Sequence, residues 1–167
     1  MTPPPNKENW TKEEAHDKHC LPDRTDKQTH VLVVDDEPGF RSMLQWELGS
    51  RGMIVEVAIN GAEAVKLIKE KTFDLVITDL TMPILDGLML LEAVKQLTPE
   101  TEVIMATGFG TVETAVHAMQ QGAYDFVLKP YDFEKLTTRI KQAMSEPSPC
   151  QCKHRTKRSK EIKKETP

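Results

Sequence analysis

Three acidic residues and one lysine stand at the ends of short apolar runs, where their side chains could handle a phosphate group. They are Asp35, Asp36, Asp79 and Lys129. Because the carboxyl ends of parallel strands lie along one edge of a sheet, where ligands bind, we expect these four side chains to meet. Grouped carboxylates can hold a divalent metal ion, and lysine supplies a compact positive charge. The sequence therefore predicts a metal site with a cation opposite it.

The elements that must position these residues alternate between short apolar runs and segments of helical periodicity. The runs are residues 31–34, 54–57, 75–78, 102–106 and 124–128. They are almost continuously apolar, as parallel strands covered on both faces require. Five strand–helix units predict an α/β domain with helices on both faces of a parallel sheet.

The spacing of apolar residues predicts which helix faces are buried. One predicted stripe contains Phe40, Met43, Leu44 and Leu48, and a second contains Val112, Ala115, Val116 and Met119. Asn60 with Glu63 resembles a helix N-terminal capping pair. Asp86 and Gly87 are a turn signal that holds the loop after Asp79, and Asp86 is not expected to be a metal ligand.

The distribution of charge argues against a nucleic-acid-binding domain. The 167 residues have a net charge of −4. Residues 30–146 carry 18 acids and 10 bases, whereas residues 147–167 carry 2 acids and 7 bases. The net negative charge of residues 30–146 is not typical of a nucleic-acid-binding domain, although residues 153–164 could contact polyanions weakly.

The two ends of the chain differ from its centre. Residues 1–29 are expected to form a disordered polar leader, and residues 147–167 a basic disordered tail. Neither a membrane span nor a signal peptide is expected, and the few cysteines fit a cytoplasmic location. These are Cys20, Cys150 and Cys152. Their spacing with nearby histidines fits no strong zinc signature, and their role stays open.

Four motifs in order resemble the receiver domain of two-component response regulators. They are Val33-Val34-Asp35-Asp36-Glu37, residues 78–87, Ala106-Thr107-Gly108 and residues 125–130. The resemblance spans residues 30–146 and implies a flavodoxin-like (βα)5 fold with strand order 2-1-3-4-5. Residues 110–130 look most like receivers attached to ATPase-type transcriptional activators.

The resemblance also implies a reaction at Asp79, which would accept a phosphoryl group from a sensor histidine kinase or a histidine phosphotransfer protein. Asp36, Asp79 and the main-chain carbonyl of Thr81 would bind Mg²⁺, with Mn²⁺ as the alternative. Asp35 would support the ion, largely through water. An acyl phosphate on Asp79 would then be the signalling form of the domain.

Four further roles follow from the same resemblance. Thr107 and Lys129 would contact the phosphoryl group. Phe126 would occupy an aromatic switch position, and we expect burial to favour its inward orientation. The bond between Lys129 and Pro130 would be cis. The face formed by the fourth helix, the fifth strand and the fifth helix would be the output surface.

The function expected from the sequence is a stand-alone receiver that contacts an unknown effector protein or a second copy of itself, and processes no metabolite. One alternative is a receiver fragment of a longer DNA-binding transcriptional regulator, although no helix-turn-helix or ATPase segment follows residue 145 in this sequence. Another is a phosphatase of the haloacid dehalogenase type. That class uses an Asp-x-Asp pair after the first strand, whereas here Asp35 and Asp36 are adjacent.

Overall fold

The computed structural model describes residues 28–145, so the expected leader and tail, all three cysteines and the basic run lie outside the described residues. The described chain forms one parallel sheet in the order β2-β1-β3-β4-β5. Its strands are β1 (His30–Val34), β2 (Ile54–Ala58), β3 (Leu75–Thr78), β4 (Glu102–Thr107) and β5 (Asp125–Leu128). The order confirms the expected flavodoxin-like topology.

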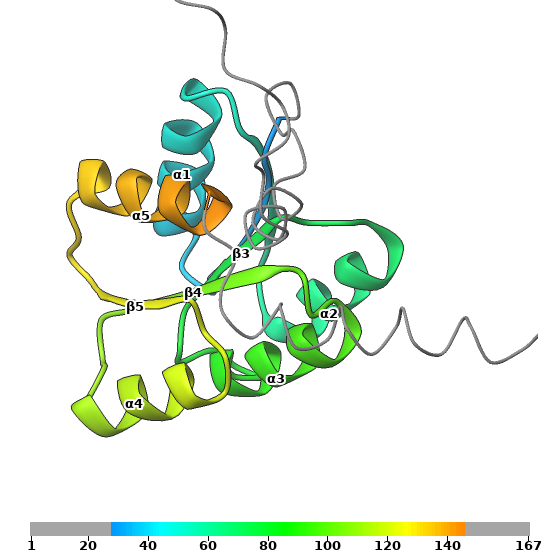
Figure 1. Cartoon of the computed structure of the whole chain (residues 1–167), viewed down its shortest axis with the longest axis vertical. Helices are drawn as coiled ribbons and strands as arrows, with labels where there is room; N and C mark the ends of the chain where they lie inside the picture. The colour runs from blue at the N-terminus through cyan, green and yellow to red at the C-terminus, as the bar shows by residue number, and fades with distance from the viewer. Residues whose placement is uncertain (1–27, 146–167) are drawn as a thin grey trace, which may run out of the picture.

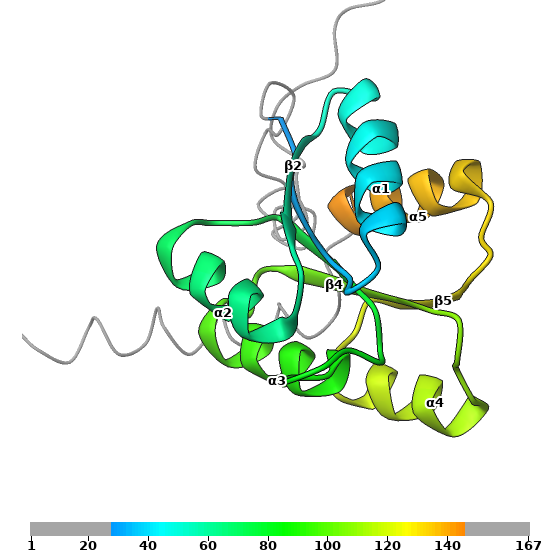
Figure 2. The same cartoon turned by 180° about the vertical axis from the view of Figure 1, so that it is seen from behind.

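Helices cover both faces of this sheet (Figures 1 and 2). They are α1 (Pro38–Ser50), α2 (Gly61–Glu70), α3 (Gly87–Leu97), α4 (Val112–Gln120) and α5 (Phe133–Ser145). Helices α1 and α5 lie on one side, and α2, α3 and α4 lie on the other. Successive residues of β1 point to opposite faces, so the sheet separates two apolar clusters. Val31 and Val33 pack with α1 and α5, whereas Leu32 and Val34 pack with α2 and α3.

The register of the strands brings the predicted site residues to one edge. Val34 of β1 pairs with Thr78 of β3, so the next residues along the two strands are neighbours. The amide of Asp79 donates to the carbonyl oxygen of Val34 at 3.0 Å. At the carboxyl ends of β4 and β5, the amide of Lys129 donates to the carbonyl oxygen of Thr107 at 2.8 Å. The sheet therefore delivers Asp35, Asp79 and Lys129 to the same edge.

Side-chain caps fix the start of α2 and α3, as Thr111 also does for α4. Asn60 caps α2 by accepting a hydrogen bond from the amide of Glu63 at 2.9 Å, as the sequence pattern predicted. Asp86 caps α3 by accepting from the amide of Met89 at 2.8 Å. Asp86 thus does more than mark a turn, because it begins the helix that follows the site loop.

Two of the predicted apolar stripes are only partly buried. In α1, Leu44 and Leu48 are buried, but Met43 is exposed and Phe40 is half-buried. In α4, Val112 is 81% exposed and Ala118 is the buried residue. Helical spacing identifies residues that share a face, but it does not show which part of that face is covered by the sheet. No helix in the described part of the chain is long and apolar enough to cross a membrane.

Candidate functional site

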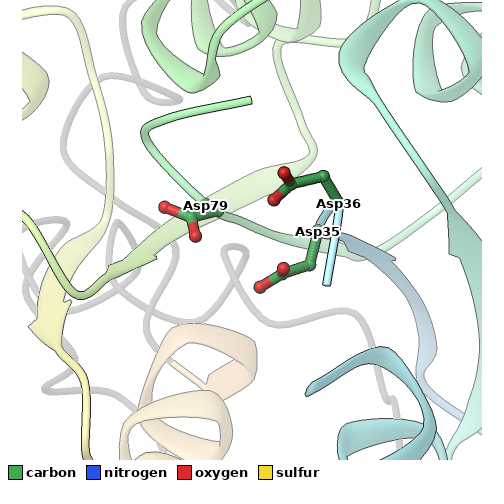
Figure 3. Close-up of side chains that lie close together, drawn as sticks. All are labelled: Asp35, Asp36 and Asp79. Atoms are coloured by element: carbon green, nitrogen blue, oxygen red, sulfur yellow. The ribbon is translucent and has the colours of Figure 1, made fainter. Parts of the chain in front are cut away.

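Three carboxylates meet at the carboxyl ends of β1 and β3 (Figure 3). Asp35 and Asp36 directly follow β1, and Asp79 directly follows β3. One oxygen from each side chain lies within 4.8 Å of the others. Asp35 is buried, Asp36 is exposed, and Asp79 has intermediate exposure. We call these three side chains the acidic cluster, and its assembly is what the ends of the apolar runs predicted.

The ammonium group of Lys129 lies against the acidic cluster. Its Nζ donates to Asp35 Oδ2 at 2.5 Å and to Asp79 Oδ2 at 3.0 Å. The lysine side chain is only 8% exposed. Burial alone would lower the pKa of Lys129, but the hydrogen bonds to Asp35 and Asp79 and the negative charges of these two residues together raise it. The lysine is therefore a fixed positive charge that offsets part of the cluster's negative charge.

Asp35 holds the turn between β1 and α1 in place. Its Oδ1 accepts from the amide of Glu37 at 2.9 Å, while its Oδ2 accepts from Lys129. The main-chain carbonyl of Asp35 accepts from Arg41 Nη1 at 2.5 Å. Each oxygen of this buried residue thus accepts a hydrogen bond from within the protein. These hydrogen bonds fix the Asp35 carboxylate at the buried side of the acidic cluster.

A tightly packed loop presents Asp79. Its Oδ1 accepts from the amide of Thr81 at 3.2 Å. The amide of Gly87 closes the loop by donating to the carbonyl of Leu80 at 2.9 Å. A Cβ atom at Gly87 would clash with the carbonyl oxygen of Asp79 and lie 2.9 Å from Leu80 Cα. Only glycine fits there, because the obstacle is main chain that cannot rotate away.

Thr107 and Phe126 lie near the adjoining loop between β4 and α4. Thr107 is fully buried, and its hydroxyl accepts from the amide of Phe109 at 3.2 Å, within its own loop. Thr107 thus lies at the carboxyl end of β4, and within residues 28–145 its hydroxyl makes no hydrogen bond to the acidic cluster. The half-buried Phe126 ring packs against the core beside α4. A Cβ at Gly110 would lie 2.6 Å from that ring, so the ring covers the loop directly.

The segment after Lys129 continues along the α1 and α5 side of the sheet. The Lys129–Pro130 peptide bond is cis. Tyr131 follows, and its ring makes an edge-to-face contact with Phe133 at a centroid distance of 5.6 Å. Burial, together with the negative charges of Asp35 and Asp79, raises the pKa of the Tyr131 phenol. Its buried hydroxyl has no hydrogen-bond partner among residues 28–145.

One contact at this site has no counterpart in the sequence predictions. The Lys129 ammonium lies 4.1 Å from the centroid of the Phe40 ring. The periodicity of α1 assigned Phe40 to the core, but the ring belongs to neither apolar cluster. Its position in the first turn after Asp35 and Asp36 is the signal that could have placed it at the site.

The acidic cluster fits a hard divalent cation. Carboxylate and carbonyl oxygens are the ligands that Mg²⁺ and Mn²⁺ prefer. One carboxylate oxygen from each of Asp35, Asp36 and Asp79 lies within 4.8 Å of the others, so the three side chains form a group that could hold a metal ion. Lys129 stands beside the cluster as a group that can attract an anion. The site can therefore bring a metal cation and a phosphate-like anion together at one carboxylate.

Comparison with known proteins identifies relatives of the described domain. The family model for the "Response regulator receiver domain" matches residues 31–141. The Klebsiella oxytoca "Transcriptional regulatory protein ZraR" is 38% identical over 119 residues, which cover 71% of this chain and 27% of that protein. The Rickettsia felis "Putative response regulator NtrX-like" is 40% identical over 118 residues, covering 70% of this chain and 25% of that protein. The chain spans about a quarter of the length of these curated relatives.

Solved structures match almost over their full length. The receiver domain of NtrX from Brucella abortus is 36% identical, with a TM-score of 0.65, and the match covers 68% of this chain and 97% of that chain. The beryllofluoride-activated NtrC4 receiver domain dimer is 40% identical, with a TM-score of 0.68, covering 71% and 98%. Both the sequence and the fold therefore point to the same family.

Proposed function

The chain belongs to the response regulator receiver domain family, and from this membership we propose that Asp79 accepts a phosphoryl group from a histidine kinase or a histidine phosphotransfer protein. The observation that carries the proposal is the acidic cluster with the Lys129 ammonium 3.0 Å from Asp79 Oδ2. The proposed setting is the cytoplasm, and the domain acts as a signalling module that processes no metabolite.

Asp79 is the best acceptor among the three acids. Both oxygens of Asp35 already accept hydrogen bonds, and that side chain is only 3% exposed. Asp36 is exposed and lies at the outer side of the cluster. Asp79 is partly accessible, and the amide of Thr81 and the lysine both point at its oxygens. Such donors can also stabilise negative charge on a phosphoryl group during transfer.

The proposed metal site uses Asp36, Asp79 and the main-chain carbonyl of Thr81, with Asp35 in support. A bound Mg²⁺ ion would neutralise negative charge on the carboxylates and on the phosphoryl oxygens. Lys129 supplies the second positive charge, because its ammonium is already held at Asp79 by the protein. The protein thus holds the positive charge of Lys129 in place at Asp79 before the phosphoryl group arrives.

The proposed reaction is a direct phosphoryl transfer. An oxygen of Asp79 attacks phosphorus as the bond between phosphorus and the donor histidine nitrogen breaks. The electron pair of that bond returns to the imidazole, and Asp79 becomes an acyl phosphate. A carboxylate nucleophile has no proton to lose in this step, so the transfer needs no general base. Hydrolysis of the acyl phosphate later restores the carboxylate, and Thr81 lies beside the route for the attacking water.

Phosphorylation is proposed to change the loop between β4 and α4. The Thr107 hydroxyl, now engaged with the amide of Phe109, can turn to donate to a phosphoryl oxygen. The Phe126 ring packs on the same loop at Gly110, so movement of the loop changes the space that the ring occupies. The output surface then includes the exposed apolar residues of α4 and β5. These are Val112, Val116, Met119 and Leu128.

Intact-mass measurement after incubation with acetyl phosphate and Mg²⁺ tests the proposal. The protein is expected to gain one phosphoryl group, and the Asp79→Asn variant is expected to gain none. Asp132→Asn is the matched control, because Asp132 is exposed and directly precedes α5, away from the acidic cluster residues that follow β1 and β3. Omission of Mg²⁺ with added EDTA should prevent the reaction. A phosphoryl adduct that persists in Asp79→Asn would contradict the assignment of the acceptor.

A second candidate function is favoured by the length of the relatives. The matched segment makes up only 27% and 28% of two of these curated proteins, and several of them are named transcriptional regulatory proteins. The domain would then be the receiver of a longer DNA-binding transcriptional regulator, and its output would act on a domain of the same polypeptide. An immunoblot of cell extract with an antibody against residues 28–145 decides this by the size of the native protein.

A further inference from the structure

The Phe40 ring is a neighbour of the Lys129 ammonium in addition to the two carboxylates. The ammonium contacts Asp35 at 2.5 Å and Asp79 at 3.0 Å, and the ring centroid lies 4.1 Å away. The face of an aromatic ring carries negative electrostatic potential and attracts a cation at this distance. The Lys129 side chain is 8% exposed, so water competes weakly for the same position. The ring is therefore an electrostatic partner of the lysine.

The start of α1 holds this ring at a fixed distance from Asp35. The amide of Glu37 donates to Asp35 Oδ1, and Arg41 donates to the Asp35 carbonyl, so the turn is tied to the carboxylate from both sides. Pro38 occupies the first position of the helix, where its fixed φ suits helical geometry. Phe40 follows within the first turn. Asp35 thus binds the Lys129 ammonium and also holds the helix start that carries the Phe40 ring.

Core packing does not account for Phe40. Leu44 and Leu48, on the same helix, are buried in the cluster between the sheet and α5. Phe40 is half-buried and belongs to neither cluster. A leucine at this position would fill a similar space but would present no negative face to the ammonium. The aromatic character of the residue is thus the property that the site uses.

We propose that Phe40 is a positioning residue that holds the Lys129 ammonium over Asp35 and Asp79, ready for the incoming phosphoryl group. This inference rests on the proposed function of Asp79 as the acceptor. Without the ring, the ammonium keeps its two carboxylate partners but samples more orientations, because its flexible four-carbon stem is no longer restrained on the third side. Preorganised charge is worth more to phosphoryl transfer than charge that must first be oriented.

A magnetic-resonance measurement on the unaltered protein tests the contact itself. Protons next to Nζ of Lys129 should resonate upfield of those of the other lysines, because they lie over the face of an aromatic ring. The upfield shift should disappear in Phe40→Leu and persist in Phe40→Tyr. A Lys129 resonance in the ordinary lysine range in the unaltered protein overturns the proposal, whatever the outcome of the phosphorylation experiments.

The rate of phosphorylation by acetyl phosphate tests the consequence of the contact. Phe40→Leu should slow the reaction by about 3- to 30-fold, and Phe40→Tyr should stay within about twofold of the unaltered protein. In a Lys129→Met background, Phe40→Leu should change the rate by less than about twofold, since the partner of the ring is gone. Any of three outcomes overturns the proposal that Phe40 positions Lys129. These are that Phe40→Leu slows the reaction equally in both backgrounds, that it does not slow the reaction at all, or that Phe40→Tyr is as slow as Phe40→Leu. Failure of Asp79 phosphorylation in the unaltered protein would instead overturn the proposed function.

Discussion

Replacing Asp36 by asparagine is expected to stabilise the metal-free protein, because it removes one of three negative charges that lie close together. The nearest oxygens of the acidic cluster lie within 4.8 Å of one another. Two unit charges about 5 Å apart repel by about 0.8 kcal/mol in water and by about 3 kcal/mol at an effective dielectric constant of 20. Asp36 is exposed, so the weaker value applies to each of its two neighbours, and Lys129 offsets part of the repulsion.

Two such repulsions sum to about 1.6 kcal/mol before the offset by Lys129, so the expected gain in the free energy of unfolding for Asp36→Asn is about 1 kcal/mol. For a domain of this size, that gain raises Tm by about 3–6 °C. Thermal unfolding followed by circular dichroism in EDTA and low salt measures the change. In about 1 M NaCl the screening length falls to about 3 Å, so the difference between the variant and the unaltered protein should shrink. Glu70→Gln is the control, because it removes the same charge at an exposed position at the end of α2.

Mg²⁺ provides the second half of the experiment. A ligand that binds only the native state raises the free energy of unfolding in proportion to the logarithm of its concentration above Kd. The unaltered protein and Glu70→Gln should gain stability on addition of Mg²⁺, whereas Asp36→Asn should gain much less. An Asp36→Asn variant that is no more stable in EDTA, and that responds fully to Mg²⁺, would refute the reasoning about the acidic cluster.

Three other substitutions test the supporting structure. Gly87→Ala should destabilise the fold by about 1–3 kcal/mol in urea denaturation, because the new Cβ meets main chain; an unchanged midpoint would contradict this. Gly110→Ala should move the Phe126 ring outward, because the new Cβ would lie 2.6 Å from it; a ring whose resonances do not change would count against the packing described here. A side-chain hydrogen bond from Arg51 lowers the pKa of Glu134, so this pair stabilises the fold above the unfolded pKa of about 4.3 and ceases to do so as pH falls through the lower folded value. The Tm difference between the unaltered protein and Glu134→Gln should therefore shrink between about pH 7 and pH 3, and a constant difference would argue that the pair contributes nothing.

The edge of the sheet that carries the site could be predicted from residue types alone. Asp35 and Asp79 end apolar runs, and parallel strands place such ends side by side. The strand order, by contrast, came from the resemblance to a family, since apolar periodicity does not specify which strands pair. The register that joins Val34 to Thr78 then explains why the acids meet.

Side-chain environment was harder to predict than the position of the elements. Phe40 and Leu44 share one apolar stripe, yet only Leu44 reaches the core. The first turn of α1 begins just beyond the end of β1, so the stripe there extends toward the site rather than over the sheet. Val112, at the start of α4, is exposed for a similar reason, because Ala118 is the buried residue through which that helix packs on the sheet. The spacing of apolar residues shows which residues of a helix share a face, but it does not show how much of that face the sheet covers.

The pocket receives its charges in a fixed order as the chain is synthesised. The carboxylates arrive with β1 and β3, whereas the ammonium arrives only with β5, at the far edge of the sheet. A nascent chain that has emerged as far as α3 thus already holds its acids but lacks their internal counter-charge. Pairing of β5 with β4 places Lys129 against these carboxylates and so supplies their internal counter-charge.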